Sequence, residues 1–477
     1  MPDALHDAWT ALLAIPHLGL YLTLGWALYL IGLGGWIVLQ KREPAATISW
    51  LLGLALLPYL GFIIYHWLGP QRIVRQRLRR ARSRASLPSP AVLHADPTAL
   101  ELARIGLATT GLAPTTATGV RLLIDGGAKY TALLADIATA RESIHLEYYI
   151  FYPDRTGTAV RDALADRARA GVRVRLLLDA VGSGKTNQRF LQPLLDAGGE
   201  VAWFHPMRLR WFWKRPWLNL RSHRKIVVID DRVAYTGGIN VTDDEDERLR
   251  TDAYRDLHLR LQGDVVRALQ QVFVEDWAYA TGAPPRLPPP PPPNPGPIAV
   301  QALTSGPDSA WEAIHRLHVG AIHSAQKRVW LATPYFVPGE AAMMALTSAA
   351  LGGLDVRLLV PKMSDSRLVT YAARSYFDDL LHAGVKVYEY GPRLLHTKAL
   401  LVDDDLALIG SANFDHRSFR LNFEVSMLFR DASIAAELAR LVEGEFTLAP
   451  RVHAERDRPL WRARLPEALA RLVSPVL

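Results

Sequence analysis

Two segments of the chain carry the same four residues at the same intervals. Each segment holds a His, then a Lys, an Asp and an Asn further along. The two sets are His223, Lys225, Asp230 and Asn240, and His396, Lys398, Asp403 and Asn413. One such match carries little weight in a chain of 477 residues, but two with identical spacing indicate a duplicated reactive site.

Imidazole and ammonium groups suit chemistry on an anionic phosphodiester. If the two segments pack about a pseudo-twofold axis, their reactive groups meet around one phosphate. One neutral His then attacks phosphorus, while the other, protonated, donates a proton to the leaving oxygen. The Lys side chains and the amides of Asn240 and Asn413 hold the non-bridging oxygens. Because the lysines supply the charge that a metal would supply, we expect no metal and no cofactor.

The reactive side chains divide between two faces of a strand. Alternate residues of a strand point the same way, so His223 projects with Lys225, and the second set repeats this. Asp230 and Asp403 lie an odd number of positions from their His and turn to the opposite face. We count both acids in the candidate catalytic set but expect them to hold structure more than to touch phosphate.

The two sets lie in matching halves of an α/β pattern. Beyond about residue 113, strand-like segments alternate with helical ones, and their order appears twice. The expected strands are residues 143–151, 171–179 and 199–204, and again 328–337, 354–360 and 384–390. The proline-rich residues 284–297 between the halves are typical of a stiff connector, although a Pro run can also be a ligand for another domain.

Two apolar runs precede the repeat. Residues 17–40 carry no formal charge and are long enough to cross a hydrocarbon core of ~30 Å. Residues 45–69 form a second run. The start of the chain contains Asp3 and Asp7 but no basic residue, which argues against a secretory signal. We therefore expect two spanning helices.

Basic residues flank the second apolar run unequally. Lys41 and Arg42 lie between the runs. Seven basic residues follow the second run: Arg72, Arg75, Arg77, Arg79, Arg80, Arg82 and Arg84. This excess predicts that everything after the second run lies on the cytoplasmic side. Beside a membrane helix, the basic run also favours contact with anionic lipid.

The two motifs are similar to those of a known superfamily. The segments HRKIVVIDDRVAYTGGIN and HTKALLVDDDLALIGSANFD resemble the duplicated HKD motifs of the phospholipase D superfamily. The resemblance extends over about residues 113–450. The N-terminal hairpin, the phrase TPYFVP at residues 333–338 and the ending RLVSPVL look most like bacterial cardiolipin synthases.

The resemblance implies a fold and an activity. The implied fold is α/β, with two phospholipase D-like α-β-α sandwich domains related by pseudo-twofold symmetry, preceded by a transmembrane helical hairpin. The implied reaction transfers a phosphatidyl group from one phosphatidylglycerol to another through a phosphohistidine and releases glycerol. The enzyme would then be a multi-pass protein of the bacterial inner membrane, in contact with anionic lipids and not with nucleic acid.

The resemblance also implies roles that spacing alone does not decide. In characterised relatives the His of the N-terminal motif attacks, which makes His223 the nucleophile and His396 the acid and base. Acids downstream of each motif orient the imidazoles. Asp256, within YRDLH, and Glu424, within RLNFE, occupy the matching places.

The expected domain boundaries follow from these patterns. They are 1–70 for two transmembrane helices, 71–112 for a basic juxtamembrane linker, 113–282 for the first domain, 283–297 for the connector and 298–477 for the second domain. The tail from about Asp457 is either a surface-lying amphipathic segment or a helix that completes the second domain.

The first half has extra residues just before its motif. They fall within residues 205–221, where aromatic and basic side chains interleave: Arg208, Arg210, Trp211, Phe212, Trp213, Lys214, Arg215 and Trp217. Such a mixture suits a bilayer interface or the stacking of nucleic-acid bases. Beside a membrane hairpin, we favour the lipid interpretation.

Composition limits the remaining alternatives. The net charge of +8 invites an anionic partner, and the absence of cysteine excludes disulfides, thiolate metal sites and a cysteine nucleophile. Hydrolysis to phosphatidic acid and a phosphatidylethanolamine donor remain open. A nuclease or a non-catalytic scaffold fits less well, because a membrane anchor and two intact motifs are present. The sequence does not indicate an oligomeric state.

Overall fold

The computed structural model describes residues 16–39, 44–57, 60, 61, 63, 65, 100–206, 220–287, 289–309 and 311–474. They form two compact units: the helices that end by residue 65, and the remainder from residue 100 onward. Each unit is described by itself below. The predicted basic run at 72–84, the loop residues Lys41 and Arg42, and most of the aromatic insertion lie outside the described residues.

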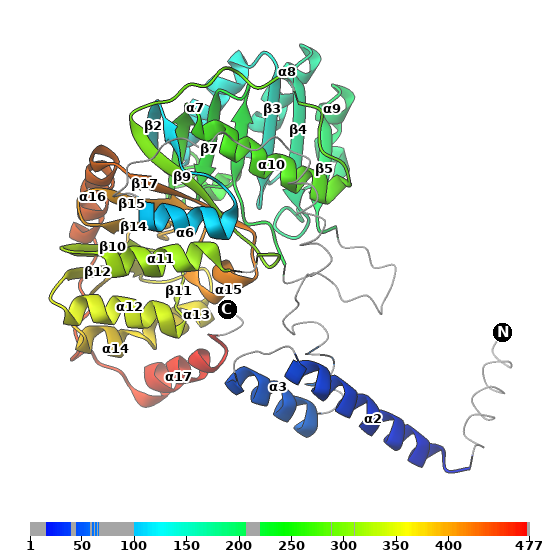
Figure 1. The fold of residues 1–477 in the computed structure, drawn as a ribbon, viewed down its shortest axis with the longest axis vertical. Coiled ribbons are helices and arrows are strands. Elements are labelled where there is room, and N and C mark those ends of the chain that lie inside the picture. Colours follow the sequence, from blue (N-terminus) through cyan, green and yellow to red (C-terminus); the bar gives the residue numbers. More distant parts are fainter. Residues whose placement is uncertain are drawn as a thin grey trace. The chain divides into compact units, whose positions relative to one another are not determined.

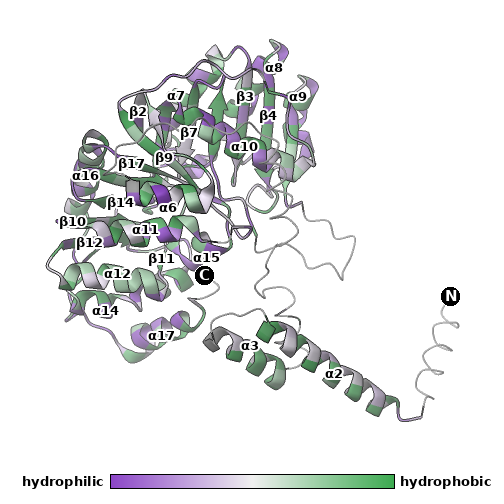
Figure 2. Cartoon of the chain, in the orientation of Figure 1, coloured by the Kyte–Doolittle hydropathy of each residue, from purple (hydrophilic) through white to green (hydrophobic). Residues whose placement is uncertain are grey.

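The N-terminal unit holds two apolar helices. Helix α2 spans Leu18–Leu39 and α3 spans Pro44–Leu56, and neither contains a charged residue. Figure 2 accordingly shows no strongly hydrophilic residue along them. Ile37 of α2 packs with Leu54 of α3 and with Tyr65, and Trp50 meets the Tyr65 ring edge-on at 5.1 Å. The two helices therefore associate through apolar side chains.

The two helices differ in whether they are long enough to cross a membrane. With 22 residues, α2 extends for about 33 Å, which exceeds a hydrocarbon core of ~30 Å. Helix α3 has 13 residues and extends for about 20 Å. Among the described residues, α2 is the one helix long and apolar enough to cross a membrane. The expected second span therefore stays a prediction.

The first half of the larger unit is built on a seven-stranded sheet (Figure 1). In spatial order its strands are β2 (Gly119–Ile124), β8 (Leu257–Gln262), β7 (Val233–Gly237), β6 (Ile226–Ile229), β3 (Ser143–Tyr148), β4 (Arg173–Asp179) and β5 (Glu200–Phe204). Its helices are α7 (Asp125–Thr139), α8 (Arg155–Arg169), α9 (Gln188–Asp196) and α10 (Val265–Thr281).

The second half is built on an eight-stranded sheet. Its strands in order are β1 (Thr115–Ala117), β9 (Ile298–Ser305), β17 (Glu424–Arg430), β15 (Leu406–Gly410), β14 (Ala399–Val402), β10 (Arg328–Ala332), β12 (Asp355–Pro361) and β13 (Lys386–Tyr390). The short strands β11 (Phe336–Val337) and β16 (Phe414–Asp415) pair separately. Its helices are α11 (Ala313–Ser324), α12 (Glu340–Leu351), α13 (Arg367–Arg374), α14 (Phe377–His382), α15 (His416–Arg420), α16 (Ala432–Thr447) and α17 (Leu465–Leu472).

The two sheets repeat one topology. Strands β3, β4 and β5 run parallel, as do β10, β12 and β13, because helices cross over between them. The strand after each motif, β6 or β14, pairs antiparallel with the first of these. Five-residue or longer stretches of the six predicted strands are present, and the predicted α/β class with two matching halves is confirmed.

The two halves share one apolar core. Ile226 and Leu259 of the first sheet belong to the same buried cluster as Leu401, Met427 and Phe429 of the second. Separate clusters fill the outer side of each sheet, beneath the helices. The sheets are therefore held together by hydrophobic burial, and the motif segments lie where the two halves meet.

Two elements cross the expected domain boundary. Helix α6 (Leu100–Thr110) falls in the predicted linker, and β1 falls in the predicted first domain. Both belong to the second half: β1 pairs with β9, and the Gln301 amide of β9 donates to the carbonyls of Ala103 and Leu112 at 3.2 and 2.8 Å. The residues that immediately precede the first half in the sequence therefore pack on the second half.

Candidate active site

The motif residues lie just before strands rather than within them. His223 and Lys225 precede β6, which begins at Ile226, and His396 and Lys398 precede β14, which begins at Ala399. The expected placement on the strands was therefore wrong by a few residues. The reason is that these segments form bridges with the opposite half and continue into their own sheet only afterwards.

The backbone bridges are reciprocal. The His223 amide donates to the Phe423 carbonyl at 2.9 Å, and the Phe423 amide donates to the Arg221 carbonyl at 2.9 Å. In the other motif, the His396 amide donates to the Arg255 carbonyl at 2.7 Å. The Arg255 amide in turn donates to the Leu394 carbonyl at 2.8 Å. Each motif is thus positioned by the segment that leads into an acid of the other half.

Each imidazole is held by an acid from the opposite half. His223 Nδ1 lies 3.0 Å from the Glu424 carboxylate, and His396 Nδ1 lies 2.6 Å from that of Asp256. Both acids are fully buried. The resemblance implied that these two acids orient the imidazoles, and the structure adds that the partners are exchanged between the halves.

The two imidazoles open into one cavity. It has a volume of ≈ 420 Å³, and both His223 and His396 line it. The other lining residues are Tyr149, Ile150, Asn240, Glu245, Tyr254, Tyr335, Val337, Asp365, Val369, Asn413, Asp415, Arg417 and Asn422. The Tyr149 ring meets His223 edge-on at 5.0 Å, and Tyr254 lies 5.4 Å from His396. A ligand in this cavity can therefore contact both motifs.

The two lysines lie behind the imidazoles. Lys225 Nζ donates to the His223 carbonyl at 2.7 Å, and Lys398 Nζ donates to the His396 carbonyl and lies 3.5 Å from Asp256. Neither lysine lines the cavity. The expected contact of both ammonium groups with phosphate stays a prediction. Their charges act on the cavity from close behind it.

Burial shifts the proton affinities of the site. It lowers the pKa of His223 to about 4, although Glu424 opposes the shift, so this imidazole is neutral at pH 7. Burial likewise lowers the pKa of Lys225 to about 7, again against Glu424, and it lowers the pKa of Lys398. Burial alone would raise the pKa of Asp256, but Lys398 and His396 outweigh it and the pKa is lowered.

A match to a family model shows which family of proteins the chain belongs to. The model described as cardiolipin synthase, phospholipase D-like domain matches residues 133–277 and 319–445, one stretch in each half. Together these stretches cover more than half of the chain. The chain belongs to the cardiolipin synthase family. A second model, described as phospholipase D-nuclease N-terminal, matches residues 27–70.

Relatives extend the similarity along the chain. The cardiolipin synthase of Geobacillus kaustophilus strain HTA426 is 40% identical, over 92% of this chain and 91% of its own. Cardiolipin synthase 2 of Bacillus anthracis is 39% identical, over 92% and 88%. Among solved structures, the phosphatidylserine synthase of Haemophilus influenzae Rd KW20 aligns with a TM-score of 0.59 at 14% identity, over 79% of this chain and 100% of its own. This last likeness concerns the fold.

The two asparagines of this family member are not equivalent. Both polar atoms of the Asn240 side chain already form hydrogen bonds: its Nδ2 donates to Glu245 at 2.6 Å, and its Oδ1 accepts from the Ile150 amide at 3.2 Å. The expectation that Asn240 holds phosphate stays a prediction. Asn413 lines the cavity, and its Oδ1 has no hydrogen-bond partner among the described residues. The Oδ1 of Asn413 therefore remains open to accept a hydrogen bond from a ligand.

Glu245 was missed in the sequence. It is buried, lines the cavity and accepts from the Asn240 backbone at 2.9 Å, where the second half has Ser418 accepting from the Asn413 backbone at 3.1 Å. A carboxylate oxygen of Glu245, one of Asp256 and a ring nitrogen of His396 all lie within 4.8 Å of one another. Three acids, Asp243–Glu245, follow the first motif, whereas the second has Asp415 and carries Ser418 at the position that matches Glu245. This difference between the copies was the available signal.

The same three residues are the ones that could hold a cation. Among the described residues, the group of Glu245, Asp256 and His396 is the one with suitable ligand atoms close together. However, His396 Nδ1 and the Asp256 carboxylate already bond each other at 2.6 Å. The expectation that the family member works without metal stays a prediction.

The third residue of each motif does not reach the cavity. The Asp230 carboxylate accepts from the backbone amides of three successive residues at 2.7–2.9 Å, namely Arg141, Glu142 and Ser143. Asp403 accepts in the same way before β10, from Gln326, Lys327 and Arg328. Both aspartates have a positive φ, 52° and 51°. Placing Asp230 and Asp403 in the catalytic set is corrected: they fix the loops that lead into β3 and β10.

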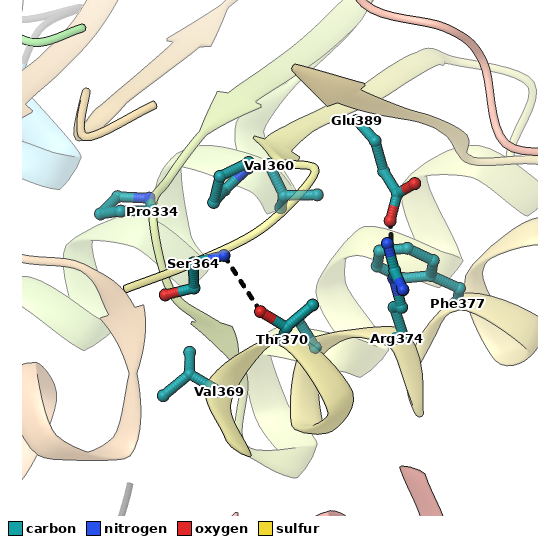
Figure 3. Close-up of a pocket in the computed structure, with 10 residues that line it drawn as sticks. Pro334, Val360, Ser364, Val369, Thr370, Arg374, Phe377 and Glu389 are labelled. Carbon is teal, nitrogen blue, oxygen red and sulfur yellow. Dashed lines mark hydrogen bonds and ion pairs between the residues drawn. The ribbon is translucent and has the colours of Figure 1, made fainter. Parts of the chain in front are cut away.

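A second cavity near the site is too small to be the site itself. It has a volume of ≈ 10 Å³, about that of one water molecule. Figure 3 shows its wall, where the Ser364 amide donates to Thr370 Oγ1 at 3.0 Å and Arg374 pairs with Glu389 at 2.8 Å. Val369 lines both cavities. This feature belongs to the packing of α13 against the sheet.

Proposed function

We propose that this chain synthesises cardiolipin by moving a phosphatidyl group from one phosphatidylglycerol to another through the cavity between its two halves. The observation that carries the proposal is that His223 and His396 line one cavity, each held by an acid of the opposite half. The chain is a phosphatidyltransferase by family, and its substrates are anionic phospholipids.

The first half-reaction forms a covalent intermediate. His223 Nδ1 bonds Glu424, which leaves the other ring nitrogen free to attack phosphorus. The phosphorus–oxygen bond to glycerol breaks as the nitrogen–phosphorus bond forms. His396, oriented by Asp256, gives its proton to the departing glycerol oxygen. The products are glycerol and a phosphatidyl-His223.

The second half-reaction returns the enzyme to its starting state. The terminal hydroxyl of a second phosphatidylglycerol gives its proton to His396 as its oxygen bonds phosphorus. The nitrogen–phosphorus bond to His223 then breaks, and cardiolipin leaves. Every proton that His396 donates in the first step is thus recovered in the second, so two phosphatidylglycerols become one cardiolipin and one glycerol.

The asymmetry of the site supports this division of roles. His223 is neutral at pH 7 because burial lowers its pKa to about 4, which suits a nucleophile. His396 lies close to two carboxylates, those of Asp256 and Glu245, whereas His223 is held by Glu424. The charges of Lys225 and Lys398 stabilise the negatively charged oxygens on phosphorus.

The membrane arrangement is part of the proposal. Helix α2 anchors the chain, and the apolar residues after it complete a second span, so the chain is multi-pass and embedded in the bacterial inner membrane. The seven arginines at 72–84 place the catalytic unit on the cytoplasmic side. Nucleic acid is not a partner.

The test uses the purified full chain in vesicles of phosphatidylglycerol alone. Cardiolipin and glycerol should form in equal amounts, with little phosphatidic acid. His223→Ala and His396→Ala should each abolish both products. Phosphatidic acid as the main product would show that water is the acceptor, and the proposal would then be wrong. Labelled phosphatidylethanolamine added to the same vesicles should not enter the product.

A further inference from the structure

The C-terminal helix α17 buries an acidic side chain and exposes leucines, the reverse of what a surface helix of a soluble domain does. In α17, Glu467 and Ala470 face the protein and are 3% and 2% exposed, while Leu469 and Leu472 face outward at 56% and 76%. Surface helices of soluble proteins bury their apolar stripe and expose the polar one. Figure 2 shows hydrophilic and hydrophobic residues together on this short helix.

Polar contacts hold α17 in this orientation. Arg458 pairs with Glu467, the buried acid of the helix, and also with Asp378 of α14. Arg471 donates to the Ser375 carbonyl at 3.0 Å and lies over the Tyr376 ring at 4.6 Å. The leucines of α17 are thus left outside because charged and polar groups, together with Ala470, make its contacts with the domain.

The outward face is one continuous stripe with a basic border. Trp461, in the π-helical turn Leu460–Arg464 before α17, is 77% exposed and lies four residues before Leu465. Positions 461, 465, 469 and 472 recur at the spacing of one helix face. Arg462 and Arg464 flank the tryptophan and have no ion-pair partner among the described residues. Exposed Trp and Leu beside unpaired Arg fit the surface of an anionic bilayer.

The stripe lies on a helix that packs against an element lining the active cavity. Helix α17 packs on α13, whose Val369 lines that cavity. Next to Val369, Leu368 is 43% exposed, and Met363 in the preceding loop is 51% exposed. Asp365 of the same loop lines the cavity. Apolar side chains therefore continue from α17 toward the region where a lipid head group must enter.

We propose that the face formed by Trp461, Leu465, Leu469 and Leu472 docks on an anionic phospholipid bilayer and sets the cavity against it. The inference rests on the proposed function only in taking the substrate from a bilayer. Docking by this face shortens the path of a head group into the cavity, and it explains why the helix keeps its leucines outside.

The absence of cysteine allows a direct test in the full chain. Leu469→Cys carries an environment-sensitive fluorophore, and Asp166→Cys on the exposed face of α8 carries the same label as a control. Figure 1 shows α8 and α17 at opposite ends of this unit. In vesicles of equal phosphatidylglycerol and phosphatidylcholine, nitroxide-bearing lipids should quench the label at 469 several-fold more than the label at 166. This readout does not require turnover.

Activity provides the second arm. The triple variant Leu465→Ser, Leu469→Ser and Leu472→Ser should lose about tenfold in activity on phosphatidylglycerol vesicles and keep its activity on short-chain phosphatidylglycerol below micelle formation. Leu448→Ser, which removes an equally exposed leucine of another segment, should change neither.

Two outcomes would overturn the inference. One is a label at 469 that soluble iodide reaches in vesicles as readily as it reaches the label at 166. The other is a label at 469 that is protected, but by a second copy of the chain, as energy transfer between labelled copies without nitroxide quenching would show. A chain that makes no cardiolipin yet shows lipid quenching at 469 would refute the proposed function and leave the docking face intact.

Discussion

At the scale of single residues, the exchange of acids between the halves explains how two motifs become one site. Glu424 contacts His223 and Asp256 contacts His396, so neither half holds a complete acid–imidazole pair of its own. The motif residues themselves could be predicted because their spacing is repeated in the sequence. The exchange could not, since spacing along the chain does not say which acid approaches which ring in space.

Removing either acid should impair turnover more than stability. Asp256→Asn and Glu424→Gln keep the shape of the side chain but lose the charge that fixes the tautomer and orientation of each imidazole. We expect kcat to fall by about 10²- to 10⁴-fold with KM little changed. Initial rates on vesicles check this, with Glu443→Gln on the exposed face of α16 as the control. Near-normal rates in either variant would contradict the orienting role.

The lysines make activity sensitive to alkaline pH. Since burial lowers the pKa of Lys225 to about 7 from an ordinary value of 10.5, this group loses its charge as the pH rises through about 7. We expect kcat/KM on a soluble short-chain substrate to decline over that range. On the acid side, activity should rise through about pH 4 as His223 loses its proton.

Glu245 sets the position of the alkaline decline. Its negative charge raises the pKa of Lys225 and of Lys398, so Glu245→Gln should lower both and move the decline to lower pH. The pH dependence of kcat/KM for the two proteins measures this shift. A decline at the same pH in the variant would show that Glu245 does not act on the lysines.

At the scale of elements, the repeated strands could be predicted and their connections across the halves could not. Alternating apolar patterns located β3, β4, β5 and their counterparts in the second half. The pairing of β1 with β9 escaped prediction because a three-residue strand has no periodicity of its own. The same holds for the motif segments, whose bridges to distant residues interrupt the strands that local sequence predicts.

The motif aspartates belong to this scale because they build loops. Asp403→Ala leaves three backbone amides before β10 without their acceptor, so we expect a loss of about 2–3 kcal/mol of stability and a lower Tm. Turnover of the folded fraction should be close to that of the parent. Asp404→Ala, which removes exposed pairs with Lys327 and Arg328, is the control and should cost less than about 1 kcal/mol. Loss of turnover without loss of stability would return Asp403 to the catalytic residues.

At the scale of the whole molecule, duplication supplies both the symmetry of the site and the departures from it. The two halves bring two His to one cavity and two Lys and two acids behind them, which is why a single chain suffices to complete the site. The departures are equally specific. Glu245 faces Asn240 where Ser418 faces Asn413, and these differences give the two imidazoles different surroundings.

The direct test of the account follows phosphorus through the enzyme. Phosphatidylglycerol labelled with ³²P is mixed with the full chain in vesicles, the reaction is stopped within one turnover, and the labelled peptide is mapped. The account predicts label on His223, in amounts that rise before cardiolipin does, and no label in His223→Ala. Label on His396, or cardiolipin formed without any labelled protein, would contradict it.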